Sequence, residues 1–319
     1  RLWKHAMSEQ SISVIVPTYK RAHLLSLTLP TYLQPETSEL IVVDDCSPDK
    51  TREVVESLAA DDPRIRYIRT DANRKQPHAK NLGISNARGE YLYFGDDDSV
   101  LLPGSLERLI TTLHDYGALI VGACAPYITR LSKDKDFSSI FEEILGEIEQ
   151  SERLQKTKIN KRLIDPVSLE ARFNIRTKEP VEVPFVQASF LVSRELAEKI
   201  CFDEHYFGNC YREETDFLIR AHNTGAKIIY EPRAIQANLP RSIAIGGAHD
   251  GSSNFLIRKL SYFKSALGNN WYFLTKNKEA LQKAFGLNIS PLHRQAVFAM
   301  IIMRVIVSYP LRKVIGHEL

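Results

Sequence analysis

Residues 11–120 alternate short apolar runs with longer segments in which apolar residues recur every three or four positions. The short runs have the length and bulk of buried strands, and the longer segments have the period of amphipathic helices. This alternation is typical of a parallel sheet with helices on both of its faces. The predicted strands are 13–16, 40–43, 65–68 and 91–94, and the predicted helices are 22–33, 49–59, 77–86 and 103–116.

The second half of the chain has a looser pattern. The amphipathic segment that precedes Gly225 predicts a helix ended by that glycine. From residue 254 onward helical patterns dominate, and we expect about two helices there. The other predicted elements are strands at 119–121, 185–192 and 228–230 and helices at 136–161 and 213–224.

Composition and charge narrow the class of protein. A net charge of +3 is too small to indicate nucleic-acid binding by itself. The cysteines lack the spacing of a zinc site, and no signal peptide is recognisable in residues 1–10, so we expect reduced thiols in a cytoplasmic protein. The four cysteines are Cys46, Cys124, Cys201 and Cys210.

The most apolar segment is 296–307, and it is too short to cross a bilayer, which requires about 20 apolar residues. As a helix it would span only about 18 Å. Arg304 interrupts it, and Arg312 and Lys313 follow. Two interpretations remain open. The segment is either a helix packed against the core or a peripheral contact with anionic lipid at the inner face of a membrane.

Three consecutive aspartates follow the predicted strand 91–94, in the stretch YLYFGDDDS. Carboxylates about 5 Å apart repel by roughly 3 kcal/mol per pair at an effective dielectric constant of about 20. A fold keeps such a cluster when the side chains point into water or when a cation holds them. Hard oxygen ligands suit Mg²⁺ or Mn²⁺ beside substrate phosphates. A solvated acidic turn and a metal site are both compatible with this stretch.

Other polar clusters also follow predicted strands, where ligands bind in an open α/β sheet. Together they offer an acceptor for a base N–H group, cations for phosphate and carboxylates for a bridging metal, which a nucleoside diphosphate requires. Neither GxGxxG nor GxxxxGK[ST] is present, so dinucleotide and P-loop chemistry are not indicated. The clusters are 17–21, Asp44-Asp45, 74–81 and 96–98.

Four ordered motifs resemble those of the family 2 glycosyltransferases, which have the GT-A fold. Any one of these motifs would be weak, but their order and spacing make the resemblance specific, and it covers roughly residues 11–240. The motifs are SVIVPTYKR (Ser13–Arg21), IVVDDCSPDKT (Ile41–Thr51), AKNLGISNARGEYLYFGDDDS (Ala79–Ser99) and YREETDFLIRAHNTG (Tyr211–Gly225).

The resemblance implies an α/β protein in which a Rossmann-like open mixed sheet is flanked by helices. It implies a catalytic domain at 11–240, with a nucleotide half at about 11–120 and an acceptor half at about 121–240. Residues 241–319 would then form a C-terminal helical extension.

The resemblance also assigns residues to the nucleotide sugar. Asp45 matches the carboxylate that accepts a hydrogen bond from the base. Lys80 stands where the family often has arginine, so a bidentate contact becomes a point charge. The remaining residues implied to bind the donor are Pro17, Tyr19 and Arg21 around the nucleoside, Lys75 near the phosphates, and Asp96 and Asp97 near the ribose and the metal's waters.

Metal binding and catalysis are implied for other acids. Asp98 matches the direct ligand of Mn²⁺ or Mg²⁺. The family often has a histidine near the position of Asn238, and His249 is a candidate for that role. Glu214 matches the usual base, which takes the proton of the acceptor hydroxyl, and its neighbour Glu213 is the alternative. A glutamate with its usual pKa of ~4.3 is ionised at neutral pH and ready for this task.

The implied reaction is the inverting transfer of one sugar from a nucleoside-diphosphate sugar, with UDP-sugars favoured, to a glycan or lipid-linked hydroxyl acceptor. Surface polysaccharide or glycolipid synthesis is the expected setting. Processive synthases carry Gln-x-x-Arg-Trp and transmembrane helices, and neither is found in the sequence. Two alternatives remain: a sugar nucleotidyltransferase, and a catalytically silent scaffold that binds nucleotide sugars.

Overall fold

The computed structural model describes residues 11–129, 142–148, 162–247 and 255–315. Over these residues the chain forms a sheet of nine strands in the order β3-β2-β1-β4-β8-β6-β9-β5, with β7 beside β9. The strands are β1 (Ile12–Thr18), β2 (Thr37–Asp44), β3 (Ile65–Arg69), β4 (Tyr91–Phe94), β5 (Ser99–Leu101), β6 (Ile120–Cys124), β7 (Val181–Glu182), β8 (Phe190–Ser193) and β9 (Ile228–Asn238).

The parallel arrangement predicted for the first half of the chain is confirmed, because β3, β2, β1 and β4 run parallel. The sheet becomes mixed where β8 lies antiparallel between β4 and β6. β6 and β9 are parallel to each other, and β5 and β7 run antiparallel to β9. The open mixed sheet implied by the resemblance is therefore present.

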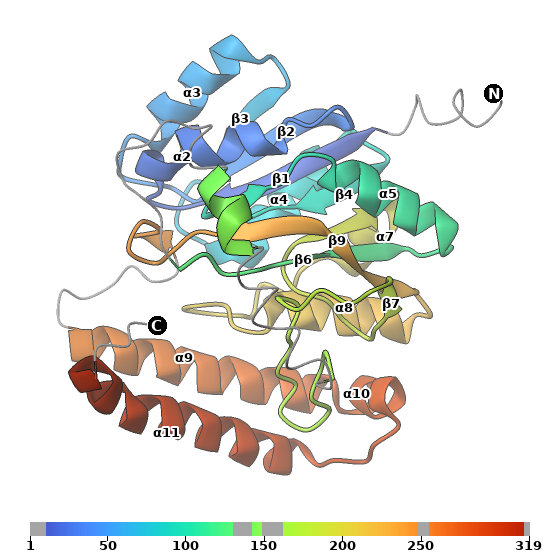
Figure 1. The fold of residues 1–319 in the computed structure, drawn as a ribbon, viewed down its shortest axis with the longest axis vertical. Coiled ribbons are helices and arrows are strands. Elements are labelled where there is room, and N and C mark those ends of the chain that lie inside the picture. The colour runs from blue at the N-terminus through green and yellow to red at the C-terminus, as the bar shows by residue number, and fades with distance from the viewer. Residues whose placement is uncertain (1–10, 130–141, 149–161, 248–254, 316–319) are drawn as a thin grey trace.

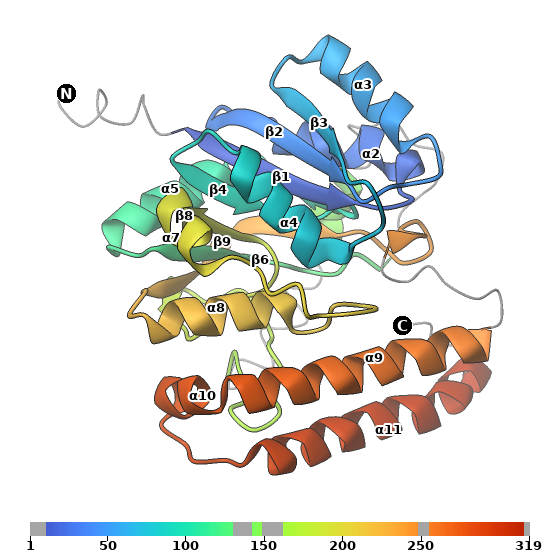
Figure 2. The ribbon, with the colours of Figure 1, turned by 180° about the vertical axis from the view of Figure 1, so that it is seen from behind.

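Helices cover both faces of this sheet (Figures 1 and 2). Alternate strand residues point to opposite faces, so Val14 and Val16 pack in one core with α2, α3 and α5. Ile15 packs in the other core with α4, α7 and α8. The helices are α2 (Ala22–Thr28), α3 (Thr51–Asp61), α4 (Lys75–Asn86), α5 (Ser105–Asp115), α7 (Arg194–Ile200) and α8 (Glu213–Asn223).

Three of the predicted elements differ in length from the observed ones, and two of these differences occur at prolines. The helix predicted at 22–33 ends at Thr28 and continues as the 3-10 turn η2 (Leu29–Tyr32), because Pro30 lacks an N–H donor. The strand predicted at 228–230 extends through Pro232 to Asn238. A register shift against β6 accommodates the residues around this proline. The strand predicted at 185–192 is shorter and begins only at Phe190.

The C-terminal region contains three helices in its described part instead of about two. They are α9 (Phe255–Lys276), α10 (Lys278–Phe285) and α11 (Pro291–Ile315). Asn277 lies outside both helices and separates α9 from α10. Gly286 ends α10 in a left-handed conformation with φ 65°. α9 and α11 lie side by side as a layer beyond α8, with α11 outermost (Figures 1 and 2). Of the helix predicted at 136–161, residues 142–148 are described and helical.

The apolar segment 296–307 lies within α11. Phe298 and Ile302 are buried against α9, which confirms a packing role for one side of this helix. None of the described helices is long and apolar enough to span a membrane.

Polar contacts fasten α9 to the segment that leads into α8. Lys276 on α9 lies 2.5 Å from Asp203 and 3.0 Å from Asp216. Asn277 donates to Asp216 at 2.7 Å, and the Tyr272 hydroxyl donates to Asp203 at 2.8 Å. The C-terminal helices are therefore joined to α8 and the segment before it through buried and partly buried acids.

Replacing Asp203 with asparagine should weaken this junction. Burial raises the pKa of Asp203, but the hydrogen bonds from Lys276, His205 and Tyr272 outweigh it and lower the pKa to about 2. A lowered pKa contributes stability above the unfolded value, and this stability is lost as the pH falls through the folded value. We therefore expect Asp203→Asn to lower the free energy of unfolding by about 1–2 kcal/mol at neutral pH, after allowing for partial exposure.

The measurement is urea denaturation followed by the fluorescence of Trp271, which lies on α9. The difference between wild type and Asp203→Asn should shrink between pH values of about 4 and 2. A difference that does not change with pH would contradict the role given to this carboxylate.

Candidate active site

The polar clusters predicted to share one sheet edge do meet there. Because β1, β2 and β4 are parallel and in register, Thr18 lies beside Asp44 and Ile15 lies beside Phe94. The loops that leave these strands carry segments 17–21, 44–45 and 96–98 to the same edge. This is the edge at which open α/β sheets bind ligands.

The three consecutive aspartates have different surroundings. Asp96 accepts a hydrogen bond from the Gln236 side chain at 3.1 Å, and Asp97 accepts one from the Thr18 hydroxyl at 2.8 Å. Asp98 has 32% of its side chain exposed, compared with 12% for Asp97. The pairwise repulsion is thus relieved in part by separate donors, and one carboxylate remains open to a ligand.

Arg21 supplies positive charge to this acidic turn from a buried position. Its Nη2 atom lies 3.2 Å from Asp98 Oδ2, and its Nε atom lies 3.9 Å from Asp97 Oδ1. Burial, followed by the charge of Asp98, raises the pKa of Asp96 to about 7. Burial likewise raises the pKa of Asp97 to about 7, although Arg21 opposes this shift. The turn therefore retains negative potential that one arginine does not neutralise.

The donor set fits a divalent cation only when a substrate adds ligands. Within the described ranges, no three or more His, Cys, Asp or Glu side chains converge on a metal position. Mg²⁺ commonly binds through one or two carboxylates together with substrate phosphates, and Asp98 can provide such a carboxylate. His249 lies outside the described residues. Asn238 ends β9 and accepts from Ser99 at 3.1 Å, beside the acidic turn.

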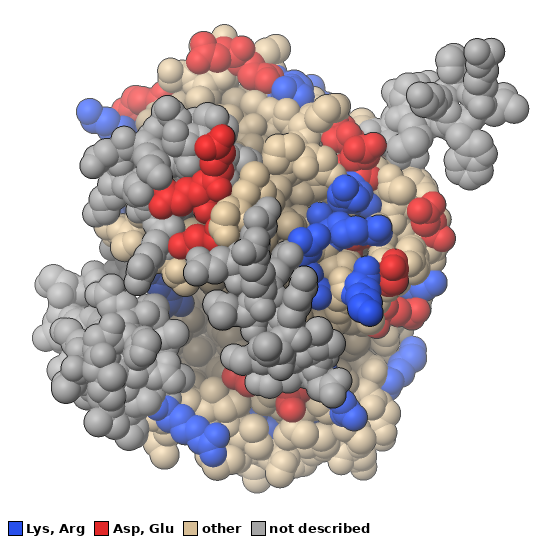
Figure 3. Space-filling model, in the orientation of Figure 1, with Lys and Arg blue, Asp and Glu red and all other residues tan. Residues whose placement is uncertain are grey.

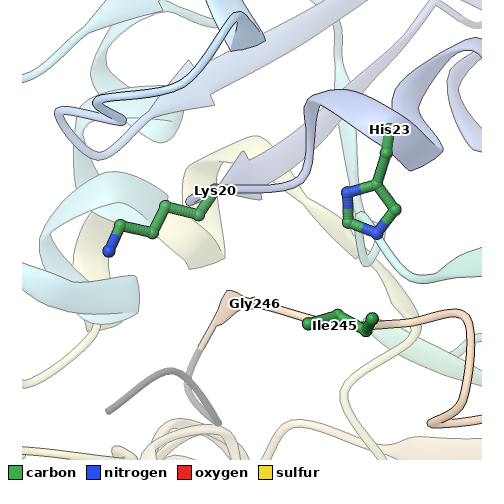
Figure 4. A pocket seen from close by; sticks show the side chains of 4 residues that line it. All are labelled: Lys20, His23, Ile245 and Gly246. Atoms are coloured by element: carbon green, nitrogen blue, oxygen red, sulfur yellow. The ribbon is translucent and has the colours of Figure 1, made fainter. Parts of the chain in front are cut away.

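A glycine-containing loop closes over the segment that follows β1. Gly247 N–H donates to the carbonyl of Tyr19 at 3.0 Å, and Arg21 donates to the carbonyl of Gly246 at 3.2 Å. A Cβ atom at Gly246 would lie 2.3 Å from the Lys20 carbonyl oxygen, so this approach requires glycine. An open pocket of about 330 Å³ lies beside the contact, lined by Lys20, His23, Ile245 and Gly246 (Figure 4).

Asp45 is buried after β2 and holds the start of α4. Its two oxygens accept from the backbone N–H groups of Arg74 and Lys75, each at 2.8 Å. Thr70 adds a third hydrogen bond at 3.2 Å. Lys75 has a left-handed backbone with φ 75° and an exposed side chain. Asp45 thus places Lys75 at the sheet edge, where both were expected.

Lys80 on α4 pairs with both glutamates at the start of α8. Its Nζ atom lies 2.8 Å from Glu213 Oε1 and 2.7 Å from Glu214 Oε1. The side chains of Lys80 and Glu213 are 1% exposed, whereas that of Glu214 is 21% exposed. Lys80, which was predicted to bind the nucleotide, therefore forms one buried cluster with the two candidate bases. Of the three side chains, only that of Glu214 is partly exposed to solvent.

The pKa values of the two glutamates are shifted in opposite directions. Burial, and then the charge of Glu214, raises the pKa of Glu213 well above its usual value. Burial also opposes ionisation of Glu214, but Lys80 outweighs it and lowers the pKa of Glu214. For Lys80, burial is outweighed by the two glutamates, and its pKa is raised. The opposite shifts of the two glutamates place a proton on Glu213 in preference to Glu214.

The C-terminal helices support α8 directly. Arg212, the residue before α8, has a left-handed backbone with φ 78° and a buried side chain. Its guanidinium donates to Asn270 on α9 at 3.0 Å and to the carbonyls of Leu169 and Ser168 at 3.0 and 3.1 Å. The start of α8, and with it Glu214, is therefore positioned from two sides.

Sequence reasoning missed the polar residues that hold the acidic turn. Gln236 on β9 donates to Asp96, and its carbonyl oxygen accepts from the hydroxyls of Tyr32 and Tyr93 at 3.1 and 2.8 Å. Thr18 holds Asp97. Nothing in the sequence pattern pointed to Gln236, because the predicted strand 228–230 ends before it, whereas in the structure its buried amide requires partners.

Comparison with known proteins places this chain in a family. The model of glycosyl transferase family 2 matches residues 13–174, which is half of the chain. The chain belongs to glycosyl transferase family 2. Similar proteins include GalNAc(5)-diNAcBac-PP-undecaprenol beta-1,3-glucosyltransferase of Campylobacter jejuni, 29% identical over 66% of this chain and 62% of the relative. Succinoglycan biosynthesis protein ExoO of Rhizobium meliloti is 36% identical over 34% of this chain and 31% of its own length.

Two solved structures share the fold. Residues 1–349 of TarS from S. aureus, in complex with UDP-GlcNAc, align over 92% of this chain and 72% of that one with a TM-score of 0.54 and 15% identity. The mannosyltransferase PcManGT from Pyrobaculum calidifontis, in complex with GDP-Man and Mn²⁺, aligns over 92% of this chain and 80% of that one with a TM-score of 0.50 and 19% identity. The GT-A fold implied by the motifs is confirmed.

Lys80→Met should destabilise the protein strongly. It leaves two glutamates without their buried cation, and breaking a buried pair costs about 3–5 kcal/mol. The loss should shrink as the pH is lowered, because protonation neutralises the stranded carboxylates. Urea denaturation at several pH values measures both effects, and Lys80→Arg, which keeps the charge, is the matched control. Equal stability of Lys80→Met and wild type at neutral pH would contradict the cluster.

Proposed function

We propose that this family 2 enzyme transfers one sugar from a nucleoside-diphosphate sugar to a hydroxyl acceptor, with inversion at the anomeric carbon. The observation that carries the proposal is the cluster of Lys80, Glu213 and Glu214. It leaves one ionised carboxylate at the start of α8. The charge of this carboxylate also raises the pKa of Asp96, so the two acids are close enough to interact. The proposed base, Glu214, therefore lies near the acidic turn 96–98, and we propose that both belong to one site.

The donor would bind at the carboxyl ends of β1, β2 and β4. Arg21 supports this placement, because its Nε and Nη1 atoms are buried without a hydrogen-bond partner in the described structure. Oxygens of a diphosphate would satisfy such donors. Asp45 and Lys75 lie at the adjoining edge for the base and phosphates. The other residues assigned to the donor are Pro17, Tyr19, Lys80, Asp96 and Asp97, with Lys80 acting through the glutamates in this proposal.

The chemical step requires a base and a stabilised leaving group. Glu214 accepts the proton of the acceptor hydroxyl while that oxygen attacks the anomeric carbon. The bond from this carbon to the diphosphate oxygen breaks on the opposite face, so one displacement inverts the configuration. Lys80 keeps Glu214 ionised and fixes its side chain before the acceptor arrives. A divalent cation at Asp98 would neutralise charge on the departing diphosphate.

The acceptor and its setting follow from relatives. The names of the two relatives concern an undecaprenol-linked glycan and succinoglycan. We therefore propose a glycan or lipid-linked acceptor in polysaccharide or glycolipid synthesis. A nucleoside-diphosphate sugar is the donor in this proposal, since one similar structure contains UDP-GlcNAc and the other contains GDP-Man. Of the two kinds of donor, a UDP-sugar is the one we favour. All four cysteines are free thiols, which supports a reducing cytoplasmic compartment.

The two glutamates can be separated by amide substitution. Glu214→Gln removes the base and should lower kcat by about 10²–10⁴-fold. Glu213→Gln is close in shape to the protonated acid and should change kcat by less than about tenfold. Transfer from UDP-GlcNAc and GDP-Man to a short-chain polyprenyl-diphosphate glycan, with donor turnover as a second readout, provides the measurement. A larger loss in Glu213→Gln than in Glu214→Gln would reverse the assignment.

Divalent cation binding should depend on the nucleotide. Since Asp98 is one ligand and the phosphates supply others, Mn²⁺ with UDP or GDP should raise the melting temperature more than the sum of each alone. A ligand at about 100 times its Kd stabilises by about 2.7 kcal/mol. Asp98→Asn should abolish the combined shift, and Asp115→Asn, an exposed acid on α5, should not. An unchanged combined shift in Asp98→Asn would remove Asp98 from the metal site.

A further inference from the structure

One face of α11 is apolar and exposed. Leu292, Met300, Met303 and Ile306 are between 45% and 70% exposed, although all are large hydrophobic side chains. They recur at spacings that place them on one side of the helix, and the exposed Ala296 lies among them. Phe298 and Ile302 lie on the adjoining side of the helix and pack against α9. The exposed stripe is thus the part of the α11 surface that does not pack against α9.

This stripe lies at the boundary of the molecule. In both ribbon views α11 is the outermost layer, and the sheet with the candidate active site lies on the other side of α8 and α9 (Figures 1 and 2). In the space-filling view the lowest part of the visible face carries few charges, and Lys and Arg side chains lie at its sides (Figure 3). A flat partner could therefore reach the stripe without covering the catalytic residues.

The sequence of the three C-terminal helices is strongly basic. Residues 255–315 contain ten Lys and Arg residues and a single acid, Glu279, which gives a net charge of +9. The whole chain carries only +3, so the remainder is net negative. His293 and Arg304 are exposed side chains along one border of the apolar stripe. Positive charge is therefore concentrated in the helices that carry the stripe.

We propose that the face of α11 formed by Leu292, Ala296, Met300, Met303 and Ile306 binds the surface of an anionic lipid bilayer. An apolar stripe bordered by cations is the pattern of a helix that lies in the membrane interface. Each basic residue near an anionic surface adds attraction, which adds to the burial of the stripe.

Two other occupants fit less well. A second copy of the chain would bring two strongly positive helical layers together, and like charges repel. A nucleic acid would match the charge but would leave the methionines and leucine without an apolar partner. The bilayer satisfies both properties at once. This proposal does not require the reaction proposed above, because membrane binding is measured without a donor or an acceptor.

The test is flotation of the full chain with vesicles. We expect binding to phosphatidylcholine vesicles that contain about one third phosphatidylglycerol, weak binding to phosphatidylcholine alone, and weaker binding as salt rises. Met300→Ser combined with Met303→Ser should lower the partition coefficient by at least about tenfold. Arg304→Glu should lower it by about tenfold on anionic vesicles. Leu119→Ser, an exposed apolar site before β6, is the matched control and should bind as wild type does.

Folding of each variant is checked by its melting temperature and by the shift that UDP and Mn²⁺ produce. Absence of wild-type binding to the anionic vesicles would overturn the proposal. Equal binding by wild type and the double methionine variant would also overturn it. A wild-type dimer that dissociates in the double methionine variant, seen by analytical ultracentrifugation, would assign the face to a second copy and overturn it as well.

Discussion

The buried ammonium group of Lys80 is the interaction on which the site depends. A lysine with 1% exposure requires opposite charge, and the protein provides two glutamates from an element 133 residues away. The contact joins α4, which packs beside the parallel strands β1 and β2, to the start of α8. Because one cation faces two carboxylates, a proton on Glu213 and a charge on Glu214 balance the charge of the cluster.

The elements that carry this cluster are themselves held at their ends. Asp45 fixes the first residues of α4 through two backbone hydrogen bonds. Arg212 and Asp216 tie the first turn of α8 to α9 through Asn270 and Asn277. The C-terminal helices therefore act as part of the support for the candidate base. Their outer surface remains available for a different contact.

The sequence predicted the sheet edge well because strand, loop and motif lie close together in the chain. The metal role expected for Asp98 stays a prediction, although its carboxylate is partly exposed at the sheet edge and lies 3.2 Å from the Arg21 guanidinium. The partner of Lys80 could not be predicted, because a cation between motifs suits phosphate and carboxylate equally. Pro232 concealed the length of β9, although a register shift accommodates it. For α11 the sequence left packing and a lipid contact open as alternatives, because its apolar residues are too evenly distributed to show which of them α9 covers.

The protonation of Glu213 tests this account most directly. Infrared difference spectroscopy between wild type and Glu213→Gln at neutral pH reports the lost carboxyl group through its stretching absorption. If Glu213 is protonated, the lost signal is the absorption of a protonated carboxyl group, which is distinct from that of a carboxylate, and this is the result we expect. A carboxylate absorption in its place would mean that both glutamates are ionised around Lys80, and it would contradict the division of charge that leaves Glu214 as the base.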